Sequence, residues 1–303
     1  MSAPSARLGA IGIYYGGRRT GTDLDVLTTS EAIDAAQLIE GLGFGAVWFG
    51  ENVGRDPFVL AAILLGNTER LTVALGIANI YARDPMTMVA AQKTLNEAFP
   101  DRFLLGLGVS HTPLVTGLRH HDSSKPYERM AGYLNAMDES VYMAVEPATP
   151  PGRVLAALGP RMLALSADRA NGAHPYLTTP EHTKLARDIL GPDHLLAPEQ
   201  MVVFETDPGE ARRISRDALN LYLTLPNYTN NLRRLGFSDA DLAGGGSDHL
   251  VDSLVAWGTD DAIAGRIAEH HAAGADHVGV QTLHDGTAVP EREWRRLAAA
   301  LQL

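Results

Sequence analysis

Apolar runs alternate with segments of helical periodicity along most of this chain. Residues 71–80 and 103–109 are two such runs, as is typical of strands that are buried on both faces of a parallel sheet. Between them, Pro85 stands where a helix can begin, and Met88 and Leu95 follow it at helical spacing. The pattern predicts a strand, a helix and a second strand parallel to the first.

The same alternation extends over the rest of the chain. Thr28 and Glu31 have the spacing of a capping box and precede a helical repeat of apolar residues. Strands are expected at residues 8–15, 46–49, 71–80, 103–109, 154–158, 174–177, 201–205 and 277–283. Eight strands that alternate with helices favour an α/β fold of the (β/α)8 TIM-barrel type over a doubly wound open sheet.

Two segments depart from this regular alternation. A long loop follows residue 111 and leads into a helix expected at 127–145. Residues 221–259 have no strand pattern and many turn-forming residues. We interpret them as a helical insertion, either a lid at the carboxyl edge of the strands or a solvated surface segment. Residues 1–303 are then expected to form a single barrel domain with insertion segments at that edge.

Composition narrows the classes of function. The 303 residues carry a formal net charge of −11, which argues against a nucleic-acid partner but allows a local basic pocket. The chain has no cysteine, which excludes disulfides and zinc-thiolate sites. No apolar run has membrane-spanning length, and the first residues lack the core of a signal peptide. A soluble cytoplasmic protein with no membrane partner is expected.

The histidines do not have the spacing of a metal site. His120–His121 and His270–His271 are adjacent pairs, whereas the helical zinc motif places its ligands four residues apart. We therefore predict no metal, and we expect His270 and His271 to face solvent in part. The stretch GLGVSH at 106–111 lacks the third glycine of a dinucleotide-binding fingerprint.

Polar residues stand at the ends of two neighbouring strands. Asn79 lies near the end of the strand at 71–80, and His111 follows the strand at 103–109. Parallel strands of a barrel present their carboxyl ends at one edge, where barrel enzymes carry their active sites. Gly76 interrupts the first of these strands, where a missing side chain permits close approach of a backbone or a ligand.

These stretches carry a resemblance to a known family. GIANIYARDP at 76–85 and RFLLGLGVSHTPLV at 102–115 resemble the bacterial luciferase-like superfamily, and within it the oxidoreductases that use the deazaflavin coenzyme F420. GAVWFGENVGRDPF at 45–58, VLAALGPRML at 154–163 and GAHPYLTTPEHT at 172–183 extend the resemblance over most of the chain. It implies a TIM barrel, F420 (8-hydroxy-5-deazaflavin) as coenzyme, and a homodimer formed through barrel helices.

The resemblance also assigns coenzyme contacts. It implies a bulge at Gly76–Ile77 with a non-prolyl cis peptide against the coenzyme ring, at a cost of about 3–4 kcal/mol; the alternative is a trans glycine bulge. It places the phosphate at the helix start after the fifth strand, where Arg161 is a suitable charge partner. The residues expected to bind the coenzyme are Asn52, Gly76, Ile77, Asn79, Gly108, Val109, Ser110, Leu158, Gly159, Pro160, Arg161 and Met162.

Two residues are candidates for catalysis. Related sugar-phosphate dehydrogenases carry an acidic proton-transferring residue at the position of His111, which here either transfers a proton or only binds substrate or caps a helix. Glu51 either accepts a hydrogen bond from coenzyme or substrate or pairs structurally with an arginine. Related enzymes often have an Asp-His pair at 51–52, and Asn52 cannot act as a general base. The residues expected to line the substrate pocket are Tyr14, His174 and Tyr176, and for His174 and Tyr176 an ordinary place in a barrel layer is the alternative.

The predicted activity is hydride exchange between F420 and an unidentified small organic substrate. The coenzyme carries this chemistry, and the protein orients it and excludes water. An FMN-dependent luciferase-like monooxygenase, which activates oxygen, is the alternative enzyme. A non-catalytic flavin-binding barrel is the alternative from another class.

Overall fold

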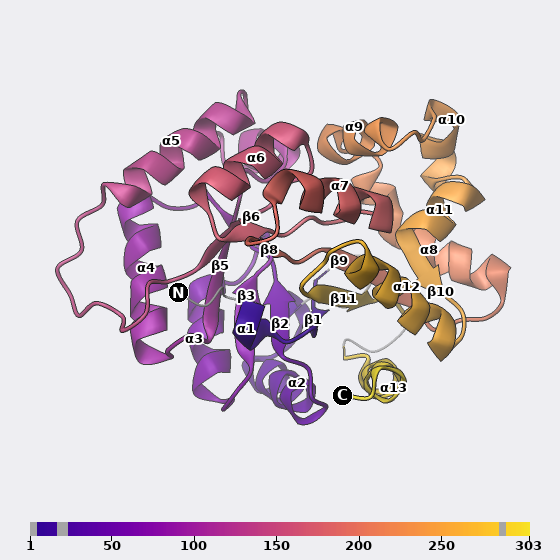
Figure 1. Ribbon diagram of the computed structural model, residues 1–303, viewed down its shortest axis with the longest axis horizontal. Helices are drawn as coiled ribbons and strands as arrows, with labels where there is room; N and C mark the ends of the chain where they lie inside the picture. Colours follow the sequence, from indigo (N-terminus) through magenta and orange to yellow (C-terminus); the bar gives the residue numbers. More distant parts are fainter. Residues whose placement is uncertain (1–4, 17–23, 285–288) are drawn as a thin grey trace.

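The computed structural model describes residues 5–16, 24–284 and 289–303, and it shows an α/β fold in which parallel strands alternate with helices (Figure 1). The strands are β1 (Ile11–Tyr14), β2 (Ala46–Phe49), β3 (Thr72–Leu75), β4 (Ala78–Asn79), β5 (Phe103–Gly108), β6 (Arg153–Leu155), β7 (Gly172–Ala173), β8 (Leu195–Leu196), β9 (Glu199–Val203), β10 (Val255–Trp257) and β11 (Val278–Thr282).

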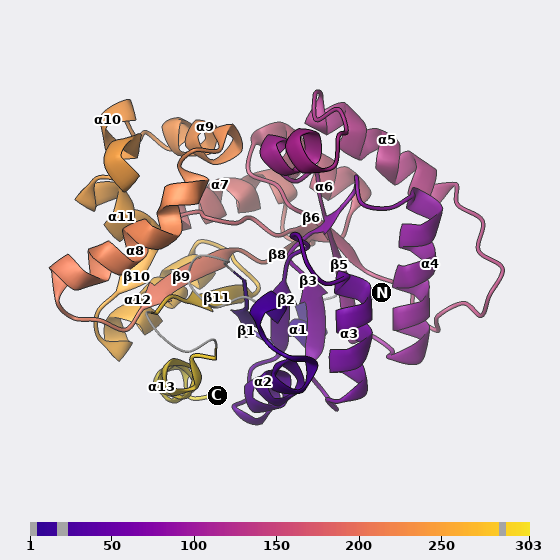
Figure 2. The same ribbon diagram turned by 180° about the vertical axis from the view of Figure 1, so that it is seen from behind.

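The helices lie outside the strands. They are α1 (Ser5–Leu8), η1 (Leu24–Val26), α2 (Thr29–Gly41), α3 (Pro57–Gly66), α4 (Pro85–Ala98), η2 (Pro113–Leu118), α5 (Pro126–Asp138), α6 (Pro160–Arg169), α7 (Pro180–Leu190), α8 (Pro208–Tyr222), α9 (Pro226–Arg234), α10 (Asp239–Leu242), η3 (Ala243–Gly245), α11 (Asp248–Leu254), α12 (Asp260–Ala272) and α13 (Glu291–Leu301). Helices α3 and α4 lie on one side of the molecule and α8 to α11 on the opposite side (Figures 1 and 2).

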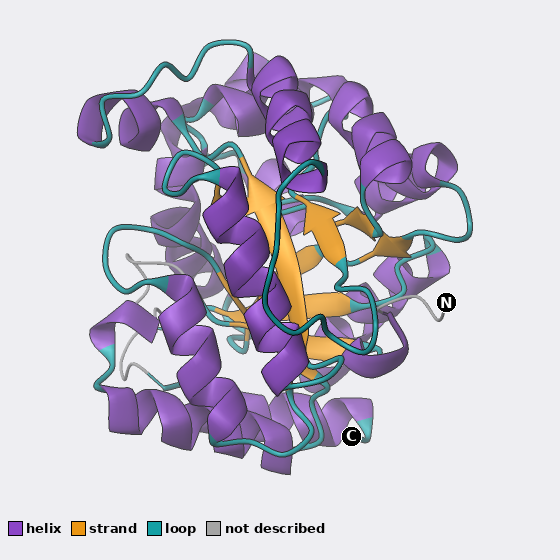
Figure 3. Ribbon diagram, turned by 90° about the vertical axis from the view of Figure 1, so that its left-hand side faces the viewer, coloured by secondary structure: helices purple, strands orange, loops and turns teal. Residues whose placement is uncertain are grey.

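The sheet has the strand order β10-β9-β11-β1-β2-β3-β5-β6-β7-β8, and β4 pairs with β5. All of these pairings are parallel, with Ile13 opposite Val47 and Val280 in the middle of the sheet. Only Ala197 and Pro198 separate β8 from β9: the Ala197 N–H donates to Ala173 on β7, and the Pro198 carbonyl accepts from Gly279 on β11. The parallel sheet thus forms a half-barrel with helices around it (Figure 3).

Apolar residues fill both sides of the sheet. On the outer side Ile39 of α2, Leu64 of α3 and Trp294 of α13 are almost completely buried, each burial worth about 1.5–3 kcal/mol or more by side-chain size. On the inner side Trp48 packs among small neighbours such as Ala74. The indole of Trp48 lies flat on the His174 imidazole, with ring centroids 4.4 Å apart. An inner residue of β2 therefore touches the residue that directly follows β7.

Local signals set most helix starts as predicted. The Thr28 hydroxyl accepts from the Glu31 backbone N–H and the Glu31 carboxylate accepts from the Thr28 backbone N–H, which confirms the capping box. Pro85 is the first residue of α4, and the Asp84 side chain caps this helix by accepting from the Met86 N–H at 2.8 Å.

The helix expected at 127–145 is shorter than predicted. Helix α5 ends at Asp138, and residues 139–152 form no further helix. The apolar residues Val141, Met143 and Val145 recur every second position, which is the spacing of an extended segment, and all three are exposed. The segment is held to α4 by Lys93, whose ammonium lies 2.7 Å from Glu146.

The strand expected at 174–177 is also wrong. Strand β7 comprises only Gly172–Ala173, and His174 follows it. Pro175 has no N–H for a sheet ladder, and Leu177 adopts a left-handed backbone with φ of 57°. The seventh predicted strand begins earlier than expected, because Glu199 and Gln200 already pair with β11.

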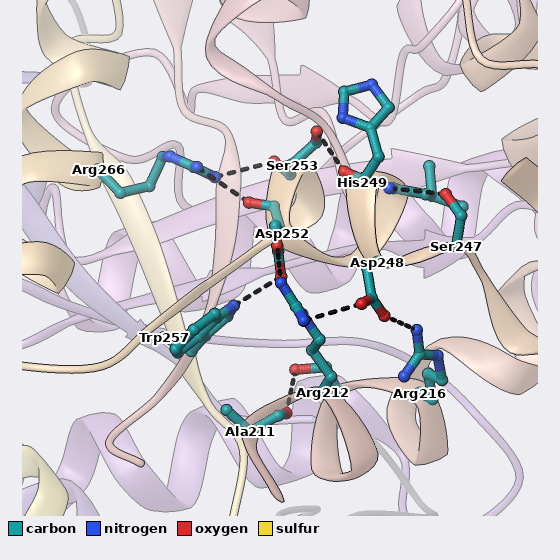
Figure 4. A network of polar contacts seen from close by, with 12 residues as sticks. Ala211, Arg212, Arg216, Ser247, Asp248, His249, Asp252, Ser253, Trp257 and Arg266 are labelled. Atoms are coloured by element: carbon teal, nitrogen blue, oxygen red, sulfur yellow. Dashed lines mark hydrogen bonds and ion pairs between the residues drawn. The ribbon is translucent and has the colours of Figure 1, made fainter. Parts of the chain in front are cut away.

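The segment 221–259 is helical, as predicted, except that its last part forms strand β10 beside β9. Helices α8 and α11 are joined by a cluster of ion pairs (Figure 4). Arg212 donates to Asp252 at 2.6 and 2.9 Å and to Asp248 at 2.8 Å, and the Trp257 indole N–H donates to Asp252 at 2.8 Å. The insertion is therefore fixed to the body at α11, while α9 reaches toward the carboxyl ends of the strands.

Candidate active site

Several predicted site residues meet at the carboxyl edge of the sheet. The backbone links the ends of two strands here, since the Glu51 N–H donates to the Ile77 carbonyl at 2.9 Å. Asn79 is completely buried, its N–H donates to the Glu51 carboxylate at 2.8 Å, and its side-chain oxygen accepts from Tyr81 N–H at 2.9 Å. The Asn79 side-chain NH2 has no partner among the described residues. Asn52 is exposed at the same edge.

Glu51, Asp56 and Arg83 form what we call the paired cluster. The Arg83 guanidinium donates to both oxygens of Glu51 at 2.7 and 3.0 Å and to Asp56 at 3.1 Å. The side chains of Arg83 and Glu51 are only 11% and 6% exposed. Asp56 also caps α3 by accepting from Phe58 and Val59. Of the two roles foreseen for Glu51, the structure shows the pairing with an arginine.

The bulge at Gly76–Ile77 is present, but its predicted cis peptide is wrong. The described residues contain no cis peptide bond. Gly76–Ile77 separates β3 from β4, and it is anchored to the end of β2: the Gly76 N–H donates to Phe49 O at 2.7 Å, and Ile77 O accepts from the Glu51 N–H at 2.9 Å. The peptide therefore does not carry the cost of a cis bond.

Gly76 is required by a neighbouring side chain. A Cβ at position 76 would lie 2.9 Å from the Tyr14 ring and its hydroxyl, which is closer than real Cβ atoms approach. Tyr14 itself stacks on His174, with centroids 5.7 Å apart, and contacts Tyr176 at 5.2 Å. The structure thus brings all three predicted pocket residues together beside the bulge.

His174 and Tyr176 differ in their hydrogen bonding. His174 Nδ1 donates to the Ala197 carbonyl at 2.6 Å, Nε2 has no partner among the described residues, and burial lowers its pKa to about 4. Tyr176 donates to Gln281 at 2.8 Å and its hydroxyl lies 2.9 Å from that of Tyr222. Burial raises the pKa of Tyr176 well above 10, so its hydroxyl keeps its proton at neutral pH.

His111 contacts the insertion. It follows Gly108, Val109 and Ser110, and Ser110 takes a left-handed backbone with φ of 56°. The His111 ring lies 5.5 Å from the ring of Tyr228 on α9, and it hydrogen-bonds the Asn227 side chain. Burial lowers the pKa of His111, the Asn227 bond opposes this, and its Nδ1 has no partner in the described part of the chain.

The predicted phosphate site is the N-terminus of α6. Gly159 is its N-cap and Pro160 its first residue, and no side chain caps it. The Arg161 guanidinium lies elsewhere, 4.3 Å from the Tyr127 ring and 3.6 Å from Glu128, with 72% of its side chain exposed. Leu158 and Met162 are partly buried, and the Leu158 carbonyl lies 2.8 Å from His182 Nε2.

A second arginine, Arg234 at the end of α9, lies at this helix start. Its guanidinium would be 3.5 Å from a Cβ on Gly159, and it has no carboxylate partner within residues 5–16, 24–284 and 289–303. Its hydrogen bond is to the Asn231 side-chain oxygen at 3.1 Å, and the buried Asn231 NH2 has no partner there. We call Gly159, Asn231 and Arg234 the open donor cluster.

Glu199 is a buried carboxyl on the inner side of the sheet. It is 1% exposed, accepts from the Leu177 N–H at 3.2 Å, and its second oxygen has no partner among the described residues. Burial raises the pKa of Glu199 to about 8, a change that the Leu177 hydrogen bond opposes. Glu199 is therefore largely protonated at neutral pH.

Sequence reasoning missed Arg234, Tyr228 and Glu199. Arg234 and Tyr228 belong to an insertion whose helical character is visible in the sequence, although the sequence does not show which strands α9 reaches. A glutamate inside an apolar strand, as in EQMVV at 199–203, was a readable signal for Glu199.

The remaining findings concern metal ligands, membrane-spanning helices and the exposure of His270. Among the described residues, no group of three or more histidine, cysteine or carboxylate side chains could hold a metal ion, and no helix is long and apolar enough to cross a membrane. His270 is not exposed as expected, because it is buried between Thr183 at 2.8 Å and Gln200 at 2.9 Å.

The sequence matches a family model. Residues 11–277 match the model described as "Luciferase-like monooxygenase". A protein of Mycobacterium tuberculosis (strain ATCC 25618 / H37Rv) named "Putative coenzyme F420-dependent oxidoreductase Rv3520c" is 26% identical over 171 residues, covering 46% of this chain and 49% of that protein.

Solved structures share the fold. An F420-dependent secondary alcohol dehydrogenase in complex with an F420-acetone adduct is 13% identical, with a TM-score of 0.75 and coverage of 100% of this chain and 98% of the other. The oxygenating constituent of a Baeyer–Villiger monooxygenase from Pseudomonas putida, in complex with FMN, is 14% identical, with a TM-score of 0.67 and coverage of 96% and 97%. At these identities the likeness establishes the fold alone.

Proposed function

The chain belongs to the luciferase-like monooxygenase family, whose model it matches over residues 11–277, and from this premise we propose that it is an F420-dependent oxidoreductase. The named relative and the alcohol dehydrogenase of the same fold are F420-dependent by their names, which supports this choice. The structural observation that supports a phosphorylated coenzyme is the open donor cluster beside the uncapped start of α6, and the named relatives favour F420 over FMN.

The architecture supports a closed (β/α)8 barrel. Strand β8 pairs with β7, β9 pairs with β11, and the two residues between β8 and β9 hydrogen-bond to both neighbours. In this reading β8 and β9 are two parts of one barrel strand and β10 is an additional strand. Residues 1–303 then form one domain, and α9 is the part of the insertion that acts as a lid at the carboxyl edge.

The open donor cluster fits a phosphate group. The guanidinium of Arg234 faces the positive end of the α6 dipole without a carboxylate nearby in the described chain, an arrangement that an anion would stabilise. The orphaned Asn231 NH2 is a further donor. Both F420 and FMN carry a phosphate, so this fit supports a phosphorylated coenzyme without separating the two. Gly159, Pro160 and the backbone of Arg161 would hold the phosphate, with Leu158 and Met162 beside it.

The residues around the bulge fit a planar ring system. Gly76, Ile77 and Asn79 lie beside the end of β5, where Gly108, Val109 and Ser110 carry the chain to His111. The deazaflavin would supply hydride transfer at its ring carbon. Tyr14, Tyr176 and His174 would exclude water and line the substrate side, and the exposed Asn52 amide could orient either partner. His111, neutral because burial lowers its pKa, would hold or receive a proton at its imidazole.

The paired cluster changes the role proposed for Glu51. Both of its oxygens already accept hydrogen bonds, from Arg83 and from the Asn79 backbone. We therefore place Glu51 as a positioning residue that holds the Asn79 backbone beside the bulge, and we assign proton transfer to His111.

A coenzyme titration tests this proposal. Fluorescence or calorimetric titration of the protein should show tighter binding of F420 than of FMN. Equal or tighter binding of FMN would instead support the FMN-dependent monooxygenase. The FMN-bound structure of the same fold is the reason for this alternative. Tight F420 binding without turnover across a screen of organic substrates would support the non-catalytic flavin-binding barrel. Light scattering of the same sample tests the expected homodimer.

A further inference from the structure

A hollow of about 450 Å³ opens beside the paired cluster. It is lined by Glu51, Asn52, Val53, Gly54, Arg55, Asp56, Ala82, Arg83, Leu114, Leu118 and Arg119. Its volume falls in the range of about 300–1,000 Å³ that is usual for small-molecule sites. It lies at the carboxyl end of β2, while the open donor cluster lies at the start of α6.

The carboxylates in this hollow already have hydrogen-bond partners, whereas some of its guanidinium nitrogens have none among the described residues. Three guanidinium groups face two carboxylates, and those two carboxylates are already paired with Arg83 and with the start of α3. Arg55 donates through one side-chain nitrogen to the Leu27 carbonyl, its other terminal nitrogen is buried without a partner in the described chain, and its backbone N–H donates to Asp25.

Arg119 also has unused donors, and it directly follows Leu118 of η2. Its guanidinium comes no closer than 3.6 Å to Glu51, which is longer than a hydrogen bond, and its buried Nε has no partner among the residues that the structure describes. Its side chain is 30% exposed, so an incoming group can reach it. A buried polar atom without a partner is costly, and the guanidinium fork matches a carboxylate with two parallel hydrogen bonds.

The rim of the hollow is apolar. Leu118 and Val53 are 64% and 45% exposed, and Leu114 is partly buried beside them. Leu114 and Leu118 belong to the π-helical segment η2, which begins two residues after His111 and is followed by Arg119. The His111 carbonyl accepts from the N–H groups of Leu114 and Val115 at 3.0 and 2.9 Å. The segment that carries the rim is thus hydrogen-bonded to the backbone of His111, the candidate catalytic residue.

We propose that this hollow binds the carboxylate of an organic acid with an apolar body, with the carboxylate on Arg119 and the apolar body against Leu114, Leu118 and Val53. The Asn52 amide lies where it can donate a further hydrogen bond. This inference deepens the proposed function, on which it rests for the ligand's role as substrate. The substrate class is then the carboxylic acids with an apolar chain.

Calorimetry on the coenzyme-free protein tests the site, with butanoate, hexanoate and octanoate as probes and hexanamide as the neutral control. Hexanoate should bind at least tenfold more tightly than hexanamide. Affinity should rise up to about fourfold for each added CH2 group that reaches the rim. Arg119→Gln should weaken hexanoate binding at least tenfold, and Arg119→Lys should retain part of it. Leu118→Ser should flatten the dependence on chain length.

Arg70→Gln is the matched control, because Arg70 is 73% exposed and its one ion-pair contact, with the exposed Glu69, is 3.8 Å long. It should bind hexanoate as the wild type does. Equal binding of hexanoate and hexanamide, or unchanged hexanoate binding in a folded Arg119→Gln variant, would overturn the proposal. Because no coenzyme is added, failure of the proposed function would show separately, as absent F420 binding with Arg119-dependent hexanoate binding intact.

Discussion

Two arginines at the carboxyl edge of the same sheet have opposite surroundings. Arg83 in the paired cluster is almost buried, and its terminal nitrogens donate to two carboxylates. Arg234 in the open donor cluster is exposed, faces the start of α6, and donates only to the Asn231 amide among the described residues. The first arrangement satisfies its own charges, and the second leaves donors for a ligand.

This difference distinguishes a charged residue that stabilises the fold from one that is available to bind a ligand. A buried, fully paired guanidinium ties strand ends and loops together, and removing it leaves uncompensated carboxylates. An exposed guanidinium at a helix N-terminus contributes little to folding, and it gains a role when an anion arrives. The residue type is the same in both places, so the three-dimensional surroundings distinguish the two arginines.

The largest expected effect concerns His111, which lies at the edge that both clusters share. His111→Gln should lower turnover by about 10²–10⁴-fold and leave F420 affinity within about twofold, since loss of a general acid or base has effects of this size. Because burial lowers the pKa of His111, the limb of the pH–rate profile that disappears should lie on the acid side of pH 6.5. Steady-state rates with a substrate found by screening give the measurement. A wild-type rate and pH profile would return His111 to a binding or structural role.

Arg83 tests the structural side of the comparison. Arg83→Met should lower the free energy of unfolding by about 3–5 kcal/mol, because Glu51 would remain buried without its partner. The matched change Arg234→Met should alter it by no more than about 0.5 kcal/mol. Urea denaturation of both variants measures this difference. Similar losses in the two would show that the arginines play the same role.

Glu199 sharpens the comparison with a buried carboxyl that lacks a cation. Its pKa is raised from 4.5 to about 8, so the folded state binds the proton more tightly than the unfolded state. The stabilisation is complete below pH 4.5 and is lost as pH rises through about 8, at up to about 1.4 kcal/mol per pH unit. Glu199→Gln should remove this slope. Unfolding free energies measured from pH 5 to 9 that fall in parallel for the two proteins would refute the assignment.

Arg234 has the smallest expected effect and the most specific. Arg234→Gln should weaken F420 binding about tenfold and leave thermal stability unchanged, since one charge-assisted hydrogen bond to phosphate is lost. Arg161→Gln serves as the control, because its side chain contacts α5 and is 72% exposed. Calorimetric titration should show near wild-type affinity for the control. A larger loss in Arg161→Gln would restore the sequence-based choice of Arg161.

The sequence predicts most of the fold on the side of β1 to β5. Strand β2 has the predicted bounds, and α3 and α4 begin at Pro57 and Pro85 as proline and aspartate caps require. Errors cluster after residue 126. There the segment with Val141 and Met143 has the spacing of an extended chain, and β7 ends where Pro175 cannot donate a hydrogen bond.

The candidate site is predictable only where it follows strand ends. Glu51, Asn79 and His111 could be located because parallel strands share an edge, but Arg83 as the partner of Glu51 required the folded loop. Arg234 is 75 positions after Gly159, and no local pattern indicates that α9 reaches α6. The geometry of the Gly76–Ile77 peptide was likewise not predictable, because no local sequence pattern shows whether this bond is cis or trans.

A crystal structure with F420 bound would test the central claim most directly. We predict that the phosphate lies at the start of α6, in contact with the Arg161 backbone N–H and the Arg234 guanidinium, with the ring against the bulge at Gly76–Ile77. The paired cluster should be unchanged. A phosphate bound at Arg83 or Arg119 instead, with Arg234 in solvent, would contradict it.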